Sequence, residues 1–171
     1  MSQARQRRRR RTETERELAA AALANSEHFM RALIDIIPGM VGYWDADLRC
    51  GFANIAYREW FGKTPEQMRG IRIQDLMGET LFKKNEPFMR AVLGGERQHF
   101  ERTLTKADGS TSYTWAHYIP DVVDGRVRGF FVLVSDITEL KQTQLQLEAT
   151  NAALEKRSVE AEAASRAKSE F

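Results

Sequence analysis

Hydrophobic positions along the chain change their spacing twice, which divides it into a helix, a mixed body and a second helix. Residues 12–37 have the helical spacing, and Pro38-Gly39 ends it. Thr12 and Glu15 have the spacing of a capping box that would open this amphipathic helix. Because its apolar face is shallow and rich in alanine, the helix should need a partner helix. The repeating apolar positions are Leu18, Ala22, Phe29, Leu33 and Ile37.

The body, residues 38–138, alternates like a set of strands around a helical middle. A turn separates the first two expected strands, and Asn54 has the chemistry to cap a helix beginning at Ile55. Short helical pieces lead to a longer helix at Glu79–Leu93, and a three-stranded meander follows. This order predicts an α+β domain, a five-stranded antiparallel sheet covered by short helices, with room for a cavity between the layers. The expected strands are Val41–Trp44, Cys50–Ala53, Gln98–Thr105, Thr111–Ile119 and Arg128–Ser135.

Residues 139–171 read as one charged helix in which leucines recur at a seven-residue step, at Leu140, Leu147 and Leu154. The facing seam is half polar, and Asn151 within it would set the register and favour a parallel dimer. A single solvated helix is the alternative. We favour a coiled coil, and therefore a homodimer held through its helical arms.

Composition limits the protein to one core with extensions, because 171 residues do not suffice for two full domains and long arms. Six of the 26 basic residues lie at Arg5 and Arg7–Arg11, so the remaining 20 are outnumbered by 24 acidic ones. This run lacks aromatic interleaving, and we expect residues 1–11 to form a disordered basic tail without specific nucleic-acid binding. No apolar run is long enough to span a membrane, and Cys50 has no intrachain partner. A cytoplasmic location is the expectation.

Several segments of the body, taken in order and at their spacing, resemble a PAS domain over about residues 26–140. The resemblance implies a sensory or dimerisation module that binds a small ligand between sheet and helices, or binds none, and passes its state along the exit helix. Asp136 and Thr138 can hydrogen-bond the turning backbone there and are the expected signal-coupling residues. The segments are Ile37–Asp45, Phe52–Tyr57, Gly62–Glu66, Lys106–Ser110 and Asp136–Thr138.

Residues 163–171 resemble the linker that leads into the phosphoacceptor helix of sensor histidine kinases. None of the three histidines has the phosphoacceptor context, and no phosphate-binding loop is visible. We therefore expect a non-enzymatic input segment that signals to a histidine kinase core outside this sequence. A ligand-free dimerisation or partner-docking module is the alternative.

The cofactor is not identified by the sequence. Haem-binding relatives present a histidine from the long helix, and residues 79–93 contain none. Flavin photosensors of the family present a reactive cysteine after the second strand, whereas Cys50 is on that strand. Both haem and cysteine-linked flavin are therefore disfavoured.

A small organic acid is the ligand that the sequence favours. Phe100, Arg102 and Leu104 alternate along one strand, so an inward Phe100 places Arg102 inward as well. A buried guanidinium requires an anionic partner, which could be Glu79, Glu86 or a ligand carboxylate. The opposite register, with Arg102 in solvent, is equally open. Further pocket candidates, each also readable as a core residue, are Tyr57, Trp60, Phe88 and Trp115.

Overall fold

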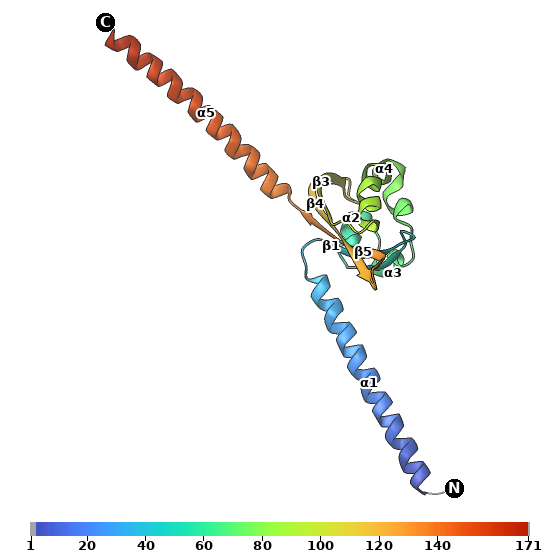
Figure 1. Cartoon of the computed structure of the whole chain (residues 1–171). Helices are drawn as coiled ribbons and strands as arrows, with labels where there is room; N and C mark the ends of the chain where they lie inside the picture. The colour runs from blue at the N-terminus through green and yellow to red at the C-terminus, as the bar shows by residue number, and fades with distance from the viewer. Residues whose placement is uncertain (1–2, 171) are drawn as a thin grey trace.

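Two long helices flank a small mixed domain (Figure 1). The computed structural model describes the backbone of residues 3–170 and the side chains of Arg10 and residues 12–170. The helices are α1 (Gln3–Asp35), α2 (Tyr57–Phe61), α3 (Pro65–Met68), α4 (Ile73–Leu93) and α5 (Thr138–Ser169). The strands are β1 (Met40–Asp45), β2 (Cys50–Ala53), β3 (Gln98–Thr105), β4 (Thr111–Val123) and β5 (Arg126–Asp136).

The five strands form one antiparallel sheet in the order β2-β1-β5-β4-β3. The expected α+β class is confirmed, and helices α2, α3 and α4 lie on one face of the sheet (Figure 1). Strand residues alternate between the two faces, so every second side chain enters the core. The buried core joins Trp44, Leu104, Ala116, Tyr118, Phe130, Val132 and Val134 of the strands to Met68, Ile73, Met89 and Val92 of the helices.

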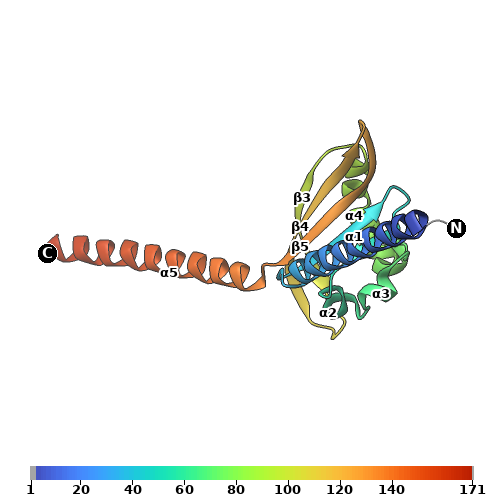
Figure 2. The same cartoon turned by 90° about the horizontal axis from the view of Figure 1, so that it is seen from below.

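The two long helices leave the domain from neighbouring points. Met40 at the start of β1 pairs with Val134 near the end of β5. Gly39 makes the approach possible, because its φ is +135° and a Cβ there would lie 2.5 Å from the carbonyl oxygen of Val134. From these points α1 and α5 extend away from the domain in different directions (Figures 1 and 2).

Helix α1 begins at Gln3 rather than at Thr12. Residues 3–11 are therefore helical, and the prediction of a disordered tail is corrected there, because arginine is a good helix former and extends an existing helix at little cost. Met1 and Ser2 of the predicted tail lie outside the described residues.

The sequence predicts that Asn54 caps a helix beginning at Ile55, but Asn54 does not cap a helix in the structure. Helix α2 begins at Tyr57 with Ala56 at its N-cap. The Asn54 side chain is instead fully buried: its oxygen accepts from the amide of Val41 at 2.9 Å, and its nitrogen donates to the carbonyls of Ile34 and Gly39 at 3.2 and 2.9 Å. Asn54 thereby fixes the end of α1 to the sheet.

The remaining differences concern lengths. Strand β4 ends at Val123 and β5 begins at Arg126, whereas the sequence predicted an end at Ile119 and a beginning at Arg128. Their hairpin is therefore longer than predicted. Helix α4 starts at Ile73, with a break at Gly78 where φ is +71°. None of the helices in the described residues is both long enough and apolar enough to cross a bilayer.

Candidate functional site

Arg102 points from β3 toward the helical layer. Strand β3 therefore has the register in which Phe100 and Arg102 both face inward. It pairs with Thr114 of β4, a fully buried residue. Its Nη1 donates to the side-chain oxygen of Asn85 on α4 and, at 3.3 Å, to the hydroxyl of Tyr118 on β4. Its guanidinium also lies 5.5 Å from the ring centre of Phe100. The sheet and α4 together position this charge.

Among the described residues, no carboxylate forms an ion pair with Arg102. Glu79 is 2.7 Å from Lys83, and Glu86 is 2.5 Å from Arg90, so neither of these two candidate acids pairs with Arg102. Both acids have a basic residue one turn away on the same helix, which is the easier contact. The Nε of Arg102 is buried and has no hydrogen-bond partner among the residues that the structure describes. A buried donor without an acceptor costs about 1–3 kcal/mol, which an added anion would recover.

A groove of about 670 Å³ lies beside Arg102 between α4 and β3. Phe88 and Phe100 stack in its wall with ring centres 3.7 Å apart. Deeper in the domain, an enclosed space of about 10 Å³ also touches Arg102. The wall of the groove is thus aromatic, with Arg102 pointing inward from β3 and Lys84 and Glu101 also among the lining residues. The other lining residues include Phe61, Leu76, Met77, Asn85, Phe88 and Phe100.

The other predicted pocket residues are divided among three places. Phe88 lines the groove, and Tyr57 borders the enclosed space, where burial raises its pKa. Trp60 is buried in α2 but does not line the groove. Trp115 is a wrong candidate: its neighbour Ala116 pairs with Phe100 and points inward, so Trp115 lies on the outer face, 41% exposed.

Sequence reasoning missed the two residues that hold Arg102. Asn85 is 2% exposed in the middle of α4, and Tyr118 is fully buried. Burial raises the pKa of Tyr118, and the nearby guanidinium of Arg102 opposes that rise. The available signal for Asn85 was an uncharged polar side chain at a helical position whose neighbours four residues away on either side, Leu81 and Met89, are apolar.

The predicted coupling residues form a closed corner where β5 turns into α5. One carboxylate oxygen of Asp136 accepts from the amide of Thr138 at 2.9 Å and from its hydroxyl at 2.6 Å. The Thr138 hydroxyl oxygen in turn accepts from the amide of Tyr113 at 2.9 Å. The amide of Ile137 donates to the carbonyl of Tyr113 at 2.8 Å. The start of α5 is therefore tied to β4.

Lys106, which the sequence reasoning overlooked as a site residue, connects this corner to α2. Its Nζ is 3.2 Å from Asp136 and 2.6 Å from Glu59, and it lies 4.6 Å from the ring centre of Trp60. The hydrogen bond to Glu59 raises the pKa of Lys106. Partial burial raises the pKa of Asp136, but hydrogen bonds from Thr138 and Lys106 outweigh it, so the net shift is downward.

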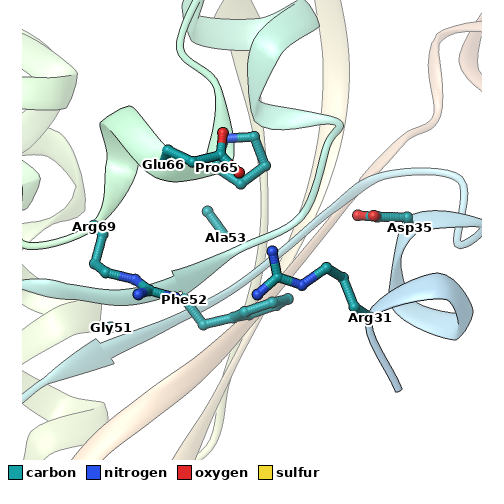
Figure 3. A pocket seen from close by; sticks show the side chains of 8 residues that line it. All are labelled: Arg31, Asp35, Gly51, Phe52, Ala53, Pro65, Glu66 and Arg69. Atoms are coloured by element: carbon teal, nitrogen blue, oxygen red, sulfur yellow. The ribbon is translucent and has the colours of Figure 1, made fainter. Parts of the chain in front are cut away.

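A second cleft, of about 330 Å³, lies where α1 meets the edge of the sheet (Figure 3). Arg31 from α1 and Arg69 from the end of α3 approach Phe52 of β2 from opposite sides (Figure 3). Asp35 accepts from the amide of Ile55 at 2.9 Å, which anchors the last turn of α1. The cleft is therefore a joint between the arm and the domain.

The part of the chain that is described contains neither a cluster of metal-binding side chains nor a reactive thiol. There, no cluster of three or more histidine, cysteine or acidic residues is arranged to hold a metal ion. Cys50 is buried, and burial raises the pKa of its thiol to about 11, which leaves little thiolate near neutral pH.

Comparison with known proteins gives one family and several similar structures. The family model for the PAS fold matches residues 34–142. The PAS domain of BvgS from Bordetella pertussis is 25% identical, with a TM-score of 0.56, and the match covers 75% of this chain and 98% of that one. No curated protein matches the chain significantly.

Structures of VqmA are similar in fold. VqmA bound to DPO is 21% identical with a TM-score of 0.56, covering 61% of this chain and 55% of that one. The VqmA dimer of Vibrio cholerae is 21% identical with a TM-score of 0.57, covering 64% and 52%. The chain thus spans about half the length of these VqmA structures. The model of the PAS fold family matches most of the chain's length, and the five-stranded sheet agrees with that match. The chain therefore belongs to the PAS fold family.

Proposed function

We propose that this PAS domain senses a small organic anion at Arg102 and passes its state through α5 to a histidine kinase core. The observation that supports the ligand class is the inward guanidinium of Arg102: within the described part of the chain its hydrogen-bond partners are neutral and its Nε has no acceptor. A carboxylate ligand would supply both the charge and the missing acceptor. The stacked rings of Phe88 and Phe100 would contact the apolar part of the ligand.

The route from groove to output runs along one strand. Arg102 lies in the middle of β3, and Lys106 lies just beyond its end. Lys106 binds Asp136 at the start of the exit corner. A ligand that pulls Arg102 toward the groove would shift this strand relative to Trp60 and Glu59 on α2. The hydrogen bonds around Asp136 and Thr138 would transfer that shift to the first turn of α5.

Thermal unfolding with a panel of short mono- and dicarboxylic acids tests the ligand site. At about 100 times its dissociation constant, a bound acid should stabilise the protein by about 2.7 kcal/mol. Arg102→Ala should abolish this stabilisation, whereas Arg97→Ala, an exposed residue just before β3, should retain it. An equal thermal shift in both variants, or no shift with any acid in the wild type, would contradict the ligand proposal.

The histidine kinase output rests on the resemblance of residues 163–171 to a kinase linker. Joining the chain in register to a histidine kinase core should give a kinase whose autophosphorylation responds to the stabilising acid. Insertion of two residues after Ser169 rotates the helix by about 200° and should change that response. An activity indifferent to both acid and register would exclude this output while leaving the ligand site intact.

A ligand-free docking module is the second candidate, favoured by the well-filled interior. The enclosed space of about 10 Å³ is no larger than a single water probe. Mass spectrometry under non-denaturing conditions separates the two functions. Purified protein with added mass beyond the polypeptide supports a ligand binder, whereas polypeptide mass alone, unchanged by the acid panel, supports docking.

A further inference from the structure

We infer that the cleft between α1 and α3 binds a free amino acid with an apolar side chain. This cleft lies at the β2 edge of the sheet, whereas the groove beside Arg102 lies at the β3 edge, and β2 and β3 are the two outermost strands. The two sites are therefore separate, and the inference does not depend on the proposed anion site. The cleft volume of about 330 Å³ is within the range of small-molecule pockets.

Two helices hold the charged side chains of the cleft in place. Arg31 and Asp35 are four residues apart on α1 and therefore lie on one side of that helix. The bond between Asp35 and the amide of Ile55, at 2.9 Å, anchors the last turn of α1. On the other wall, the fully buried Met68 anchors α3 in the core, and Arg69 follows it at the end of that helix. Both walls thus start from anchored backbone.

The charges of the cleft balance, but the arginines do not pair with the acids. Two lining residues are basic, Arg31 and Arg69, and two are acidic, Asp35 and Glu66. Neither arginine forms an ion pair with any residue that the structure describes. Hydrogen bonds from its own amide and from Thr64 lower the pKa of Glu66, and the two arginines lower it further. Both guanidinium groups therefore act on one carboxylate without contacting it, and their donors are available to a ligand.

A ligand with one positive and one negative group matches these charges better than a simple anion. A carboxylate between Arg31 and Arg69 would receive charge-assisted hydrogen bonds from two planar guanidinium groups. A phosphate would gain the same bonds, but Asp35 and Glu66 would repel its second charge. An ammonium group is instead attracted by these two acids. In the described contacts Asp35 uses only one carboxylate oxygen, so the other can accept from the ammonium group. An α-amino acid carries both groups on one carbon.

The apolar surface of the cleft selects the side chain of the amino acid. Phe52 lies between the two arginines, and its ring is partly exposed (Figure 3). Pro65 and the buried Ala53 line the same cleft. An apolar or aromatic side chain would cover the Phe52 ring and remove its surface from water. A charged side chain would add a third charge without a partner. Leucine and phenylalanine are therefore the expected ligands, and glutamate and lysine are not.

Calorimetry with the full chain tests the class of ligand. L-Phenylalanine should bind. Phenylpropionate, which lacks the ammonium group, and phenethylamine, which lacks the carboxylate, should bind at least about tenfold more weakly. Arg31→Gln and Arg69→Gln should each weaken the binding of phenylalanine by a similar factor, and both side chains are exposed, so these variants should fold. Arg16→Gln, on an exposed part of α1, and Arg102→Ala, in the proposed anion site, should bind it as the wild type does.

Hydrogen exchange shows whether the ligand closes the joint between α1 and the domain. Opening of the joint releases the amide of Ile55 from Asp35 and separates the two walls of the cleft. A ligand that binds only the closed form therefore slows exchange of this amide, by about tenfold at ten times its dissociation constant. The amide of Tyr113, which is bound at the exit corner, should exchange at an unchanged rate.

Three results would overturn the inference. One is the absence of binding with any standard amino acid at millimolar concentration. Another is phenylpropionate that binds as tightly as phenylalanine and loses its binding in Arg69→Gln, because the cleft would then be a plain anion site. The third is phenylalanine binding that is lost in Arg102→Ala but kept in Arg69→Gln, which would place the ligand in the groove. A failure of organic acids to bind at Arg102 would overturn only the proposed function, since different variants report on the two sites.

Discussion

Lys106 Nζ lies 3.2 Å from the carboxylate of Asp136, and this contact joins the turn after β3 to the end of β5. The lysine side chain is only 15% exposed, since it is enclosed by Glu59, Asp136 and the Trp60 ring. One cation thus bridges the helical layer, the β3–β4 turn and the exit corner. Among the described contacts, this cluster connects α2 to the corner from which α5 starts.

Replacing Lys106 with methionine should loosen the exit corner. Methionine can still cover Trp60, but it loses two ion pairs and the cation–π contact, for an expected destabilisation of about 1–2 kcal/mol in urea unfolding. The amides of Tyr113 and Ile137, which close the corner, should exchange hydrogen faster. Lys83→Met removes an exposed ion pair and should cost under about 0.5 kcal/mol. Equal effects of the two substitutions would contradict the bridging role.

Asp136→Ala removes the acceptor that holds Thr138. We expect a loss of about 1 kcal/mol, the value of a cap or turn hydrogen bond. In a chimera with a kinase core, the same change should make output insensitive to the input domain, because the corner would no longer be fixed to β4. Normal regulation in that chimera would count against the coupling assignment.

The same carboxylate predicts a pH dependence. Because the pKa of Asp136 is lowered from 3.8 on folding, the unfolded chain binds its proton more readily. Its stabilisation is fully present above pH 3.8 and is lost as the pH falls through the lowered pKa. Asp136→Asn lacks this titration, so the difference in unfolding free energy between wild type and variant should shrink across that range. A difference that stays constant with pH would exclude Asp136 as its source.

Alternation along the strands made the fold predictable. The register that places Phe100 and Leu104 in the core also places Arg102 there, and the β3 limits agree with the structure. Trp115 was misplaced because strand alternation alone does not say which of two apolar sets faces inward: Tyr113, Trp115 and Ile119 are as apolar as Ala116 and Tyr118. Pairing with β3 decides between them.

Contacts between distant segments were beyond the sequence. Asn54 precedes a helix and has the chemistry of a cap, but the loop that returns at Gly39 offers it a buried carbonyl, and this tertiary contact prevails. Lys106 sits in a turn where a lysine is ordinarily solvated. Its role depends on Glu59 and Asp136, which are brought to it by the folding of α2 and β5.

Asn54→Ala should destabilise the protein more than any loop substitution of similar size. It leaves the amide of Val41 and the carbonyls of Ile34 and Gly39 without their partner in a buried place, at a cost of about 3 kcal/mol. Denaturant unfolding measures the loss. Asn25→Ala on exposed α1 is the matched control and should change stability by under about 0.5 kcal/mol. A small effect at Asn54 would show that α1 is not anchored through it.

Leucines on α5 give the last prediction. Leu140, Leu147 and Leu154 are 62%, 59% and 56% exposed along a helix with no buried residue, and Asn151 lies on the facing seam. We expect a parallel coiled coil in the dimer. Leu147→Glu with Leu154→Glu places like charges across its seam and should give monomers at tens of micromolar in light scattering.

Ala149→Glu with Ala152→Glu adds the same charge on the opposite side of α5 and should leave the dimer intact. This control separates a loss of seam packing from a general effect of negative charge on the helix, since both pairs of substitutions add two carboxylates within two turns. A wild-type chain that is monomeric at these concentrations would exclude the coiled coil. Dissociation by both pairs would instead show that long-range repulsion between the added charges breaks the dimer. Added salt should then restore the dimer by screening that repulsion.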